Sequence, residues 1–279
     1  MFDFNIVLIL LIAALMHAIW NAVVKFNGEK IYILSMIDGM AMLIGLLFIP
    51  FVAIPEIGTW FYIATSVILN IFYRIFLIKA YELGEFSSVY PLVRGLPPLA
   101  VTIMAMFFLD ENIAVTNLSG IALISAGIIT LMLGRFDYQK RTILYSVTSG
   151  LFIAVYTVID GAGIRLSNNV FSYIVWFTVL ENLPFPLYTT LCHHQKFKIF
   201  LRTSFKKGFL GGLAAAAGYG IVLWAMTQTN LGSVSALREA SILFATIIGL
   251  LVFKESFGLK KIMASSLIVT GIFLIQFSI

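Results

Sequence analysis

The sequence predicts an all-α membrane protein whose ten transmembrane helices form two inverted repeats of five helices. Composition is the first reason, because 61% of the 279 residues are hydrophobic and only 11% are charged. A soluble domain has about 45–50% apolar and about 25% charged residues, so lipid must cover much of this chain. The other reasons are the length of the apolar runs and a set of matching polar residues in the two halves.

Ten apolar segments follow one another, each near the length of about 20 residues that a helix needs to cross a bilayer. They are residues 4–26, 31–54, 59–82, 86–109, 113–135, 142–166, 170–193, 207–229, 232–253 and 259–278. The runs do not alternate at period two, which excludes a transmembrane β-barrel. Connections such as "LGEFSS" and "TNLG" leave no room for a soluble domain.

The N-terminus and the single cysteine bear on processing and on metal binding. The opening "MFDFN" has an acid where a signal peptide carries basic residues, so we expect no cleavable signal. Cys192 is the only cysteine, which excludes a disulfide within the chain and argues against a cysteine-based metal site. We therefore expect neither a metal ion nor a cofactor.

Basic residues between the segments lie almost entirely on one side of the expected membrane. The connections one–two, five–six, seven–eight and nine–ten hold thirteen of them, whereas Arg165 alone lies on the other side. The positive-inside rule places the thirteen in the cytoplasm and both termini outside. The net charge of +5 is thus a topology signal and does not indicate nucleic-acid binding. The thirteen are Lys25, Lys30, Arg135, Lys140, Arg141, Lys196, Lys198, Arg202, Lys206, Lys207, Lys254, Lys260 and Lys261.

Polar and small residues recur in the two halves of the chain at a nearly constant spacing. The matching pairs are Arg94 and Arg238, Glu111 and Glu255, and Gly127 and Gly271, each 144 residues apart, and Asp38 and Glu181, 143 apart. We therefore expect two repeats, residues 1–139 and 140–279. Each holds five segments, an odd number, so the second copy must cross the membrane in the opposite orientation, a plan that recurs in secondary transporters.

Three of these features together resemble the drug/metabolite transporter superfamily, EamA type. They are the layout of ten spans from two copies, "HAIWNAVVK" in the first span, and the acids that close spans four and nine in "FFLDE" and "LVFKE". The resemblance covers the whole chain and implies a secondary transporter that works by alternating access without a nucleotide site. The sequence contains no G-x-x-x-x-G-K-[ST] loop, which agrees. Members of this superfamily carry amino acids, sugars, nucleotide-related compounds, quaternary amines or drugs, so the resemblance selects no substrate.

Arg94 and Arg238 are the strongest candidates for substrate contact. The repeat places one guanidinium toward each face of the membrane, and a guanidinium holds a carboxylate or phosphate in a planar fork at any physiological pH. Charged side chains inside spans are costly and are usually functional. The alternative is structural, with both arginines neutralising Glu181, Asp38 or Glu239. In "VYPLVRGLPPLA" the prolines around Arg94 predict a broken helix, which marks either a substrate site or a packing kink.

The first span carries His17, Trp20 and Asn21 on one helix face. Such a face suits the wall of a cavity, and His17 could relay a proton because its unperturbed pKa is near neutrality. The alternative is an interhelical hydrogen-bond patch around a neutral histidine. We expect the cavity between spans one, three, four, six, eight and nine, a choice that follows the resemblance together with the polar residues.

Spans three, six and eight supply the remaining candidates. Tyr156 and Asp160 lie four residues apart in span six, where an aspartate is a proton or cation site by default and could otherwise neutralise Arg74. Arg74 in span three and Tyr219 in span eight complete the candidate substrate-binding set. Residues proposed for ion coupling or proton relay are His17, Asp38, Asp160, Glu181 and Glu239. Three arginines against four acids inside the spans suit a zwitterion, and the two arginines would repel a strongly cationic drug.

These observations predict a secondary active transporter of a small polar metabolite that is anionic or zwitterionic, such as an amino acid, an organic acid or a phosphonate. The alternatives are an exporter of amphipathic amines or drugs and, in another class, a membrane-embedded lipid-modifying enzyme or flippase. The expected partners are a small substrate, lipid, and protons or a counter-substrate, with the chain a monomer or homodimer. We expect it in a bacterial inner membrane. The substrate, direction, coupling ion and oligomeric state stay open.

Overall fold

The computed structural model describes residues 4–25, 27–83, 86–132, 140–244, 247–248 and 259–276, and all regular structure in these ranges is helical. The all-α class is thereby confirmed. Glu255 and Lys254, which carried part of the predicted repeat and topology, lie outside the described residues. So does Arg135, close to the predicted boundary between the repeats at 139.

Six described helical stretches are long and apolar enough to cross a membrane. They are α1 (Phe4–Lys25), α2 (Lys30–Phe48) with the 3-10 turn η1 (Ile49–Phe51), α3 (Ile57–Leu83), α7 (Lys140–Leu166), α8 (Val170–Glu181) with α9 (Pro184–Cys192), and α10 (His194–Ala225). The shorter helices are α4 (Phe86–Gly95), α5 (Pro97–Phe108), α6 (Val115–Met132), α11 (Leu231–Arg238) and α13 (Leu259–Gln276). The chain is therefore a multi-pass membrane protein, and the count of ten spans stays a prediction.

Proline interrupts two of the predicted spans. The helix ends at Gly95 and resumes at Pro97, because a proline cannot donate to the preceding turn but fits the first turn of a new helix. This break in span four was predicted. A second break lies between Glu181 and Pro184, and it was not predicted although Pro184 signals it. A third break follows Arg238 without any proline or glycine beside it.

The start of α10 differs from the prediction. The helix begins at His194, whereas we expected span eight to begin at residue 207. The predicted loop is helical because lysine and arginine are good helix formers. The apolar run marks only the part of a helix that lies in lipid, so hydropathy misses a basic helical extension into water.

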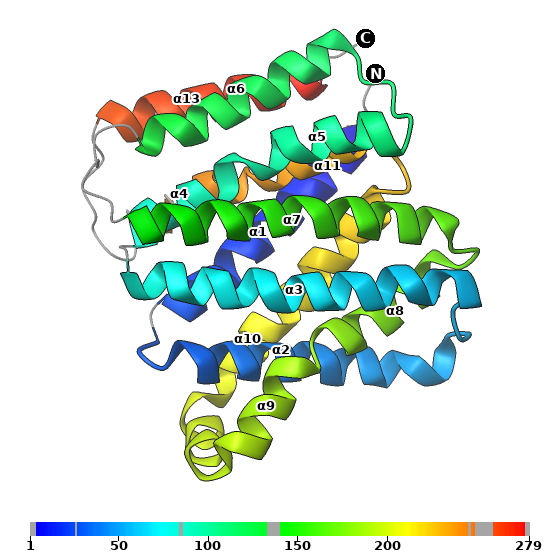
Figure 1. Cartoon of the computed structure of the whole chain (residues 1–279), viewed down its shortest axis with the longest axis vertical. Coiled ribbons are helices and arrows are strands. Elements are labelled where there is room, and N and C mark those ends of the chain that lie inside the picture. Colours follow the sequence, from blue (N-terminus) through cyan, green and yellow to red (C-terminus); the bar gives the residue numbers. More distant parts are fainter. Residues whose placement is uncertain are drawn as a thin grey trace.

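The helices pack in pairs across the bundle (Figure 1). Helix α3 lies along α7, α10 crosses α1 and α2, and α6 lies against α13. Glycines set the last contact, because a Cβ atom on Gly120 would lie 2.7 Å from the carbonyl oxygen of Gly271. Small residues at such positions let membrane helices approach closely.

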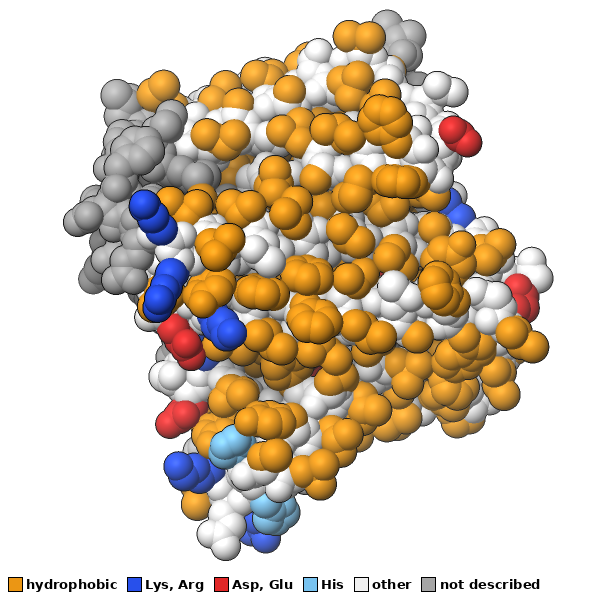
Figure 2. Space-filling model, in the orientation of Figure 1, with side chains coloured by type: hydrophobic (Ala, Val, Ile, Leu, Met, Phe, Trp, Pro, Cys, Tyr) orange, Lys and Arg blue, Asp and Glu red, His pale blue; other side chains and the backbone are white. Residues whose placement is uncertain are grey.

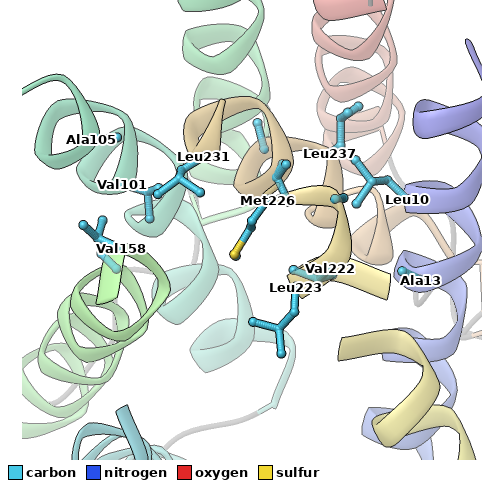
Figure 3. Packing of buried hydrophobic residues seen from close by; sticks show 14 of the residues in the cluster. Leu10, Ala13, Val101, Ala105, Val158, Val222, Leu223, Met226, Leu231 and Leu237 are labelled. Carbon is cyan, nitrogen blue, oxygen red and sulfur yellow. The ribbon is translucent and has the colours of Figure 1, made fainter. Parts of the chain in front are cut away.

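A buried apolar cluster fixes α11 in the middle of the bundle (Figure 3). Leu231 and Leu237 of α11 are fully buried, and the cluster also includes Leu10 of α1, Val101 of α5 and Val222 of α10. Since Arg238 follows Leu237 directly, this packing fixes where its side chain begins.

Hydrophobic side chains also cover the outside. In Figure 2 they form a band across the middle of the visible face, and the charged side chains lie along its two edges. Phe51, Ile57, Phe107 and Val115 each expose more than 70% of their surface. An apolar surface of this kind requires lipid as its solvent.

Candidate functional site

One cavity of about 310 Å³ lies among α1, α2, α3, α7, α8, α10 and the last residue of α11. Nine of the twelve candidate residues from the sequence line it: His17, Trp20, Asn21, Asp38, Arg74, Tyr156, Glu181, Tyr219 and Arg238. Arg94, Asp160 and Glu239 are not among the lining residues. Helices α2 and α8 contribute to the wall, which we did not expect, and among the described residues none from α4 or α5 does.

The α1 face forms one wall of the cavity, where Trp20 and Asn21 both bond to His17. The indole nitrogen of Trp20 donates to Nδ1 of His17 at 3.2 Å, and the Asn21 amide donates to the His17 carbonyl at 2.8 Å. The other ring nitrogen of His17 contacts the Arg94 guanidinium. A neutral imidazole can accept at one nitrogen only, so His17 cannot accept from Trp20 and Arg94 at the same time.

Arg74 joins two acids from opposite halves of the chain. Its guanidinium donates to Asp38 on α2 and, at 2.5 Å, to Glu181 on α8. The Asn182 amide donates to the second oxygen of Glu181 at 3.1 Å. All three side chains reach the cavity, where two carboxyl groups share one guanidinium.

Arg94 is paired behind the cavity. Its guanidinium donates to Glu239 at 3.1 Å, and the two side chains are 4% and 2% exposed. This contact was one of the structural alternatives that the sequence left open for Arg94.

Arg238 has different surroundings from Arg94. Its Cζ atom lies 5.2 Å from the centre of the Tyr219 ring, within the range of a cation–π contact. No described residue forms a salt bridge with Arg238, although its side chain borders the cavity. A buried guanidinium without a carboxylate partner is an available site for an anionic group.

Asp160 lies directly behind Tyr219. The tyrosine hydroxyl donates to Oδ2 of Asp160 at 2.5 Å, and the aspartate is fully buried. Arg74, which the sequence left open as a partner of Asp160, is bound instead by Asp38 and Glu181.

Sequence reasoning missed several polar residues of the wall, among them Tyr73, Thr178 and Asn182. Helical spacing could have found them. Thr178, Glu181 and Asn182 repeat the spacing of His17, Trp20 and Asn21 that marked α1, and Tyr73 shares the face of Asn70 and Leu77 on α3. In the described part of the chain, no three His, Cys, Asp or Glu side chains gather as metal ligands would.

A cluster of polar residues links the helices at one end of the bundle. Lys30, the first residue of α2, lies at the opposite end (Figure 1). Glu111 accepts from the Leu231 amide at 3.0 and 3.1 Å, which satisfies the start of α11. Arg165 binds Glu111 at 2.6 Å and donates to the carbonyls of Met226 and Thr229, each at 2.7 Å. These bonds tie α7 to the junction of α10 and α11.

Comparison with known proteins adds the family. Residues 140–277 match the EamA-like transporter family. This match in the second half of the chain supports the resemblance to the drug/metabolite transporter superfamily. Its relatives by sequence include a WAT1-related chloroplastic protein of Arabidopsis thaliana, with 22% identity over 252 residues, which are 84% of this chain. The match spans only 60% of that relative's length.

A solved crystal structure shares the fold of this chain, with a TM-score of 0.74 over 98% of each chain at 16% identity. At this identity the likeness concerns the fold alone. The apolar helices make the chain a multi-pass membrane protein, and its second half resembles a family of transporters.

Proposed function

We propose that this EamA-type protein is a secondary active transporter of a small metabolite that carries a carboxylate, phosphate or phosphonate group. The observation that carries the proposal is the Arg238 guanidinium, which borders a cavity of about 310 Å³ and has no salt bridge with a described residue. An anion entering from water would find its counter-charge already in place, so the protein need not reorganise to bind it.

The opposite wall supports a zwitterion among such substrates. Asp38 and Glu181 share the single charge of Arg74, so this wall keeps one negative charge beside the cavity. An ammonium group could be held there while a carboxylate lies at Arg238. A purely cationic drug would meet the positive charge of Arg238, which has no salt bridge with a described residue, and this disfavours the drug.

Close helix contacts support the ten-span inverted repeat with halves 1–139 and 140–279. A Cβ atom on Gly127 would lie 2.9 Å from the carbonyl oxygen of Ala264, and one on Gly271 would lie 2.6 Å from that of Gly120. At the repeat spacing of 144 residues, Gly127 corresponds to Gly271 and Gly120 to Ala264. The two contacts therefore exchange when the halves exchange, as a two-fold relation between repeats requires.

The two ends of the bundle support alternating access as the proposed mechanism. Lys30 and Tyr81 line the cavity at the end that carries the basic residues, whereas Glu111 and Arg165 tie helices together at the other end. With the positive-inside orientation, we propose that this arrangement is the one closed outside and accessible from the cytoplasm. In the opposite arrangement we propose that Arg94 leaves Glu239 and takes over the anion.

The deciding experiment is a thermal-stability assay of the purified protein with three compounds of one carbon skeleton. Leucine is a zwitterion, 4-methylpentanoate lacks its ammonium group, and 3-methylbutylamine lacks its carboxylate. We expect the first two to raise the melting temperature of the wild type, because a ligand that binds only the folded state stabilises it. Arg238→Gln should lose this response and still fold, whereas Arg202→Gln, which removes an exposed arginine on α10, should keep it.

Stabilisation by the amine alone would overturn the proposal and favour an exporter of amines. Uptake of the stabilising compound into proteoliposomes, with and without a pH gradient, separates a transporter of soluble compounds from a flippase or a lipid-modifying enzyme.

A further inference from the structure

Asp160 is the one acid around the cavity that has no guanidinium partner among the described residues. Asp38 and Glu181 are bonded to Arg74, and Glu239 is bonded to Arg94. A fully buried carboxylate is costly unless it is paired, hydrogen-bonded or protonated. The surroundings of Asp160 therefore determine which of these conditions it meets.

Those surroundings satisfy only half of the carboxyl group. Oδ2 accepts the hydroxyl of Tyr219 at 2.5 Å. Oδ1 is buried and has no hydrogen-bond partner among the described residues, although Ser66 of α3 lies beside the group. An oxygen with free lone pairs in a dry environment can bind a proton.

Tyr219 connects this group to the cavity and separates it from Arg238. Its ring lies under the Arg238 guanidinium and its hydroxyl reaches Asp160, so the two opposite charges lie on either side of one side chain. Tyr219 and Arg238 line the cavity, whereas Asp160 does not. Arg238 attracts the Asp160 carboxylate electrostatically, whereas burial of the carboxyl group and the charge of Glu181 act in the opposite direction.

We propose that Asp160 takes up one proton when an anionic substrate binds Arg238, which makes the protein a proton–anion symporter. In the empty cavity the charge of Arg238 stabilises the Asp160 carboxylate. A bound anion neutralises Arg238 and leaves Asp160 as an uncompensated negative charge, which a proton from cavity water removes. Net charge is then conserved, because one anion and one proton enter together. The proposal rests on the proposed function, since it requires the anion to bind at Arg238.

Polar and charged groups on the helices around α7 influence whether Asp160 binds a proton. Those that face Asp160 come from α3, α8, α10, α11 and α7 itself: Ser66, Tyr173, Glu181, Tyr219, Arg238 and Tyr156. Glu181 is held by Arg74, and Arg94 of α4 is held by Glu239, so neither supplies a free counter-charge. Helix α5 has no ionisable side chain.

The test measures the affinity of the purified protein for 4-methylpentanoate as a function of pH, above about pH 6, where the carboxyl group of the probe is ionised. Uptake of one proton per anion predicts that affinity falls about tenfold for each unit of rising pH over the range in which free Asp160 is ionised. Asp160→Asn should bind the probe with no such slope. The matched control Asp110→Asn removes an exposed acid in a loop and should keep the slope.

A slope that survives in Asp160→Asn, or a wild type that binds the probe equally at every pH, would overturn the proposal. Tyr219→Phe provides a variant that keeps the ring under Arg238 and removes only the hydroxyl on Asp160. It should keep the slope but move it toward alkaline pH, because the carboxylate loses a stabilising hydrogen bond. A slope unchanged in position would count against Asp160 as the proton site.

Infrared spectroscopy separates this proposal from the proposed function. A protonated carboxylic acid gives a carbonyl band that a carboxylate lacks, so a pH titration should show a band present in the wild type and missing in Asp160→Asn. If no anion binds at all, the proposed function and the coupling both fail. If the anion binds and adding it produces no Asp160 band, only the coupling fails.

Discussion

Arg94 and Arg238 occupy matching positions in the two halves, yet they differ in what surrounds them. Arg94 is bonded to Glu239 and in contact with His17, whereas Arg238 borders the cavity above Tyr219. The sequence identified both because charges are rare in spans. It could not separate their roles, since residue spacing does not determine which acid from a distant helix reaches which arginine.

The buried pair predicts a stability effect at Arg94. The sequence alone favours Arg94→Ala as a variant that folds and does not transport, but loss of Arg94 leaves Glu239 without its ion-pair partner. Removing one member of a buried pair costs about 3–5 kcal/mol, so we expect Arg94→Gln to lower the unfolding free energy by that order. Urea or thermal unfolding in detergent measures it.

The double variant Arg94→Gln, Glu239→Gln serves as the control. It removes both charges and should recover part of the loss, because two neutral amides can bond each other. A single Arg94→Gln variant as stable as the wild type would show that the pair adds nothing to folding in this protein.

Helices and the breaks in them could be predicted where a nearby residue, such as a proline, indicates the break. Pro97 and Pro98 mark the start of α5, and that break was expected. The end of α11 at Arg238 has no such mark, because Leu237 and Glu239 on either side of it are good helix formers. The basic start of α10 was missed for another reason, since hydropathy reports contact with lipid and not helix length.

The contact between α6 and α13 predicts the effect of a single methyl group. A Cβ atom on Gly120 would lie 2.7 Å from both the Gly271 carbonyl oxygen and a side-chain carbon of Ile275. Gly120→Ala should therefore destabilise the protein by about 1–3 kcal/mol through overpacking. Gly58→Ala is the matched control, because its nearest neighbour would be a Leu166 side-chain carbon at 3.8 Å. Thermal unfolding compares them.

If the two repeats are equivalent at this contact, Gly271→Ala should cost about as much as Gly120→Ala. Two very unequal losses, or no loss at Gly120, would contradict the close packing of α6 and α13.

At the scale of the whole molecule, the cavity could not be predicted from the sequence, because helices far apart along the chain form its wall. Its wall combines α1, α2, α3, α7, α8, α10 and α11, and the sequence indicated the polar face of each helix more securely than its neighbours. Asp38 and Glu181 were recognised as a matched pair, but their meeting on one arginine depends on how α2, α3 and α8 cross. That crossing is a property of packing, which hydrophobic periodicity does not specify.

Cys192 offers a test of the orientation of the chain. It is exposed at the end of α9, next to the basic start of α10. The positive-inside rule predicts that it lies on the cytoplasmic side. A membrane-impermeant maleimide should label the protein in inside-out vesicles and not in right-side-out vesicles, with Cys192→Ser as the unlabelled control. Labelling only from the outside would reverse the predicted topology.

Arg74 has no equal in the other half of the chain, where the repeat spacing of 143 places Ala217. Asp38 and Glu181, which match at the repeat spacing, thus both bind a guanidinium that only the first half of the chain supplies. A carrier with two identical halves would rest equally in either direction. If the chain is the inverted-repeat carrier proposed above, this imbalance gives its two resting states different energies and a built-in preference for one side of the membrane, even before any gradient is applied.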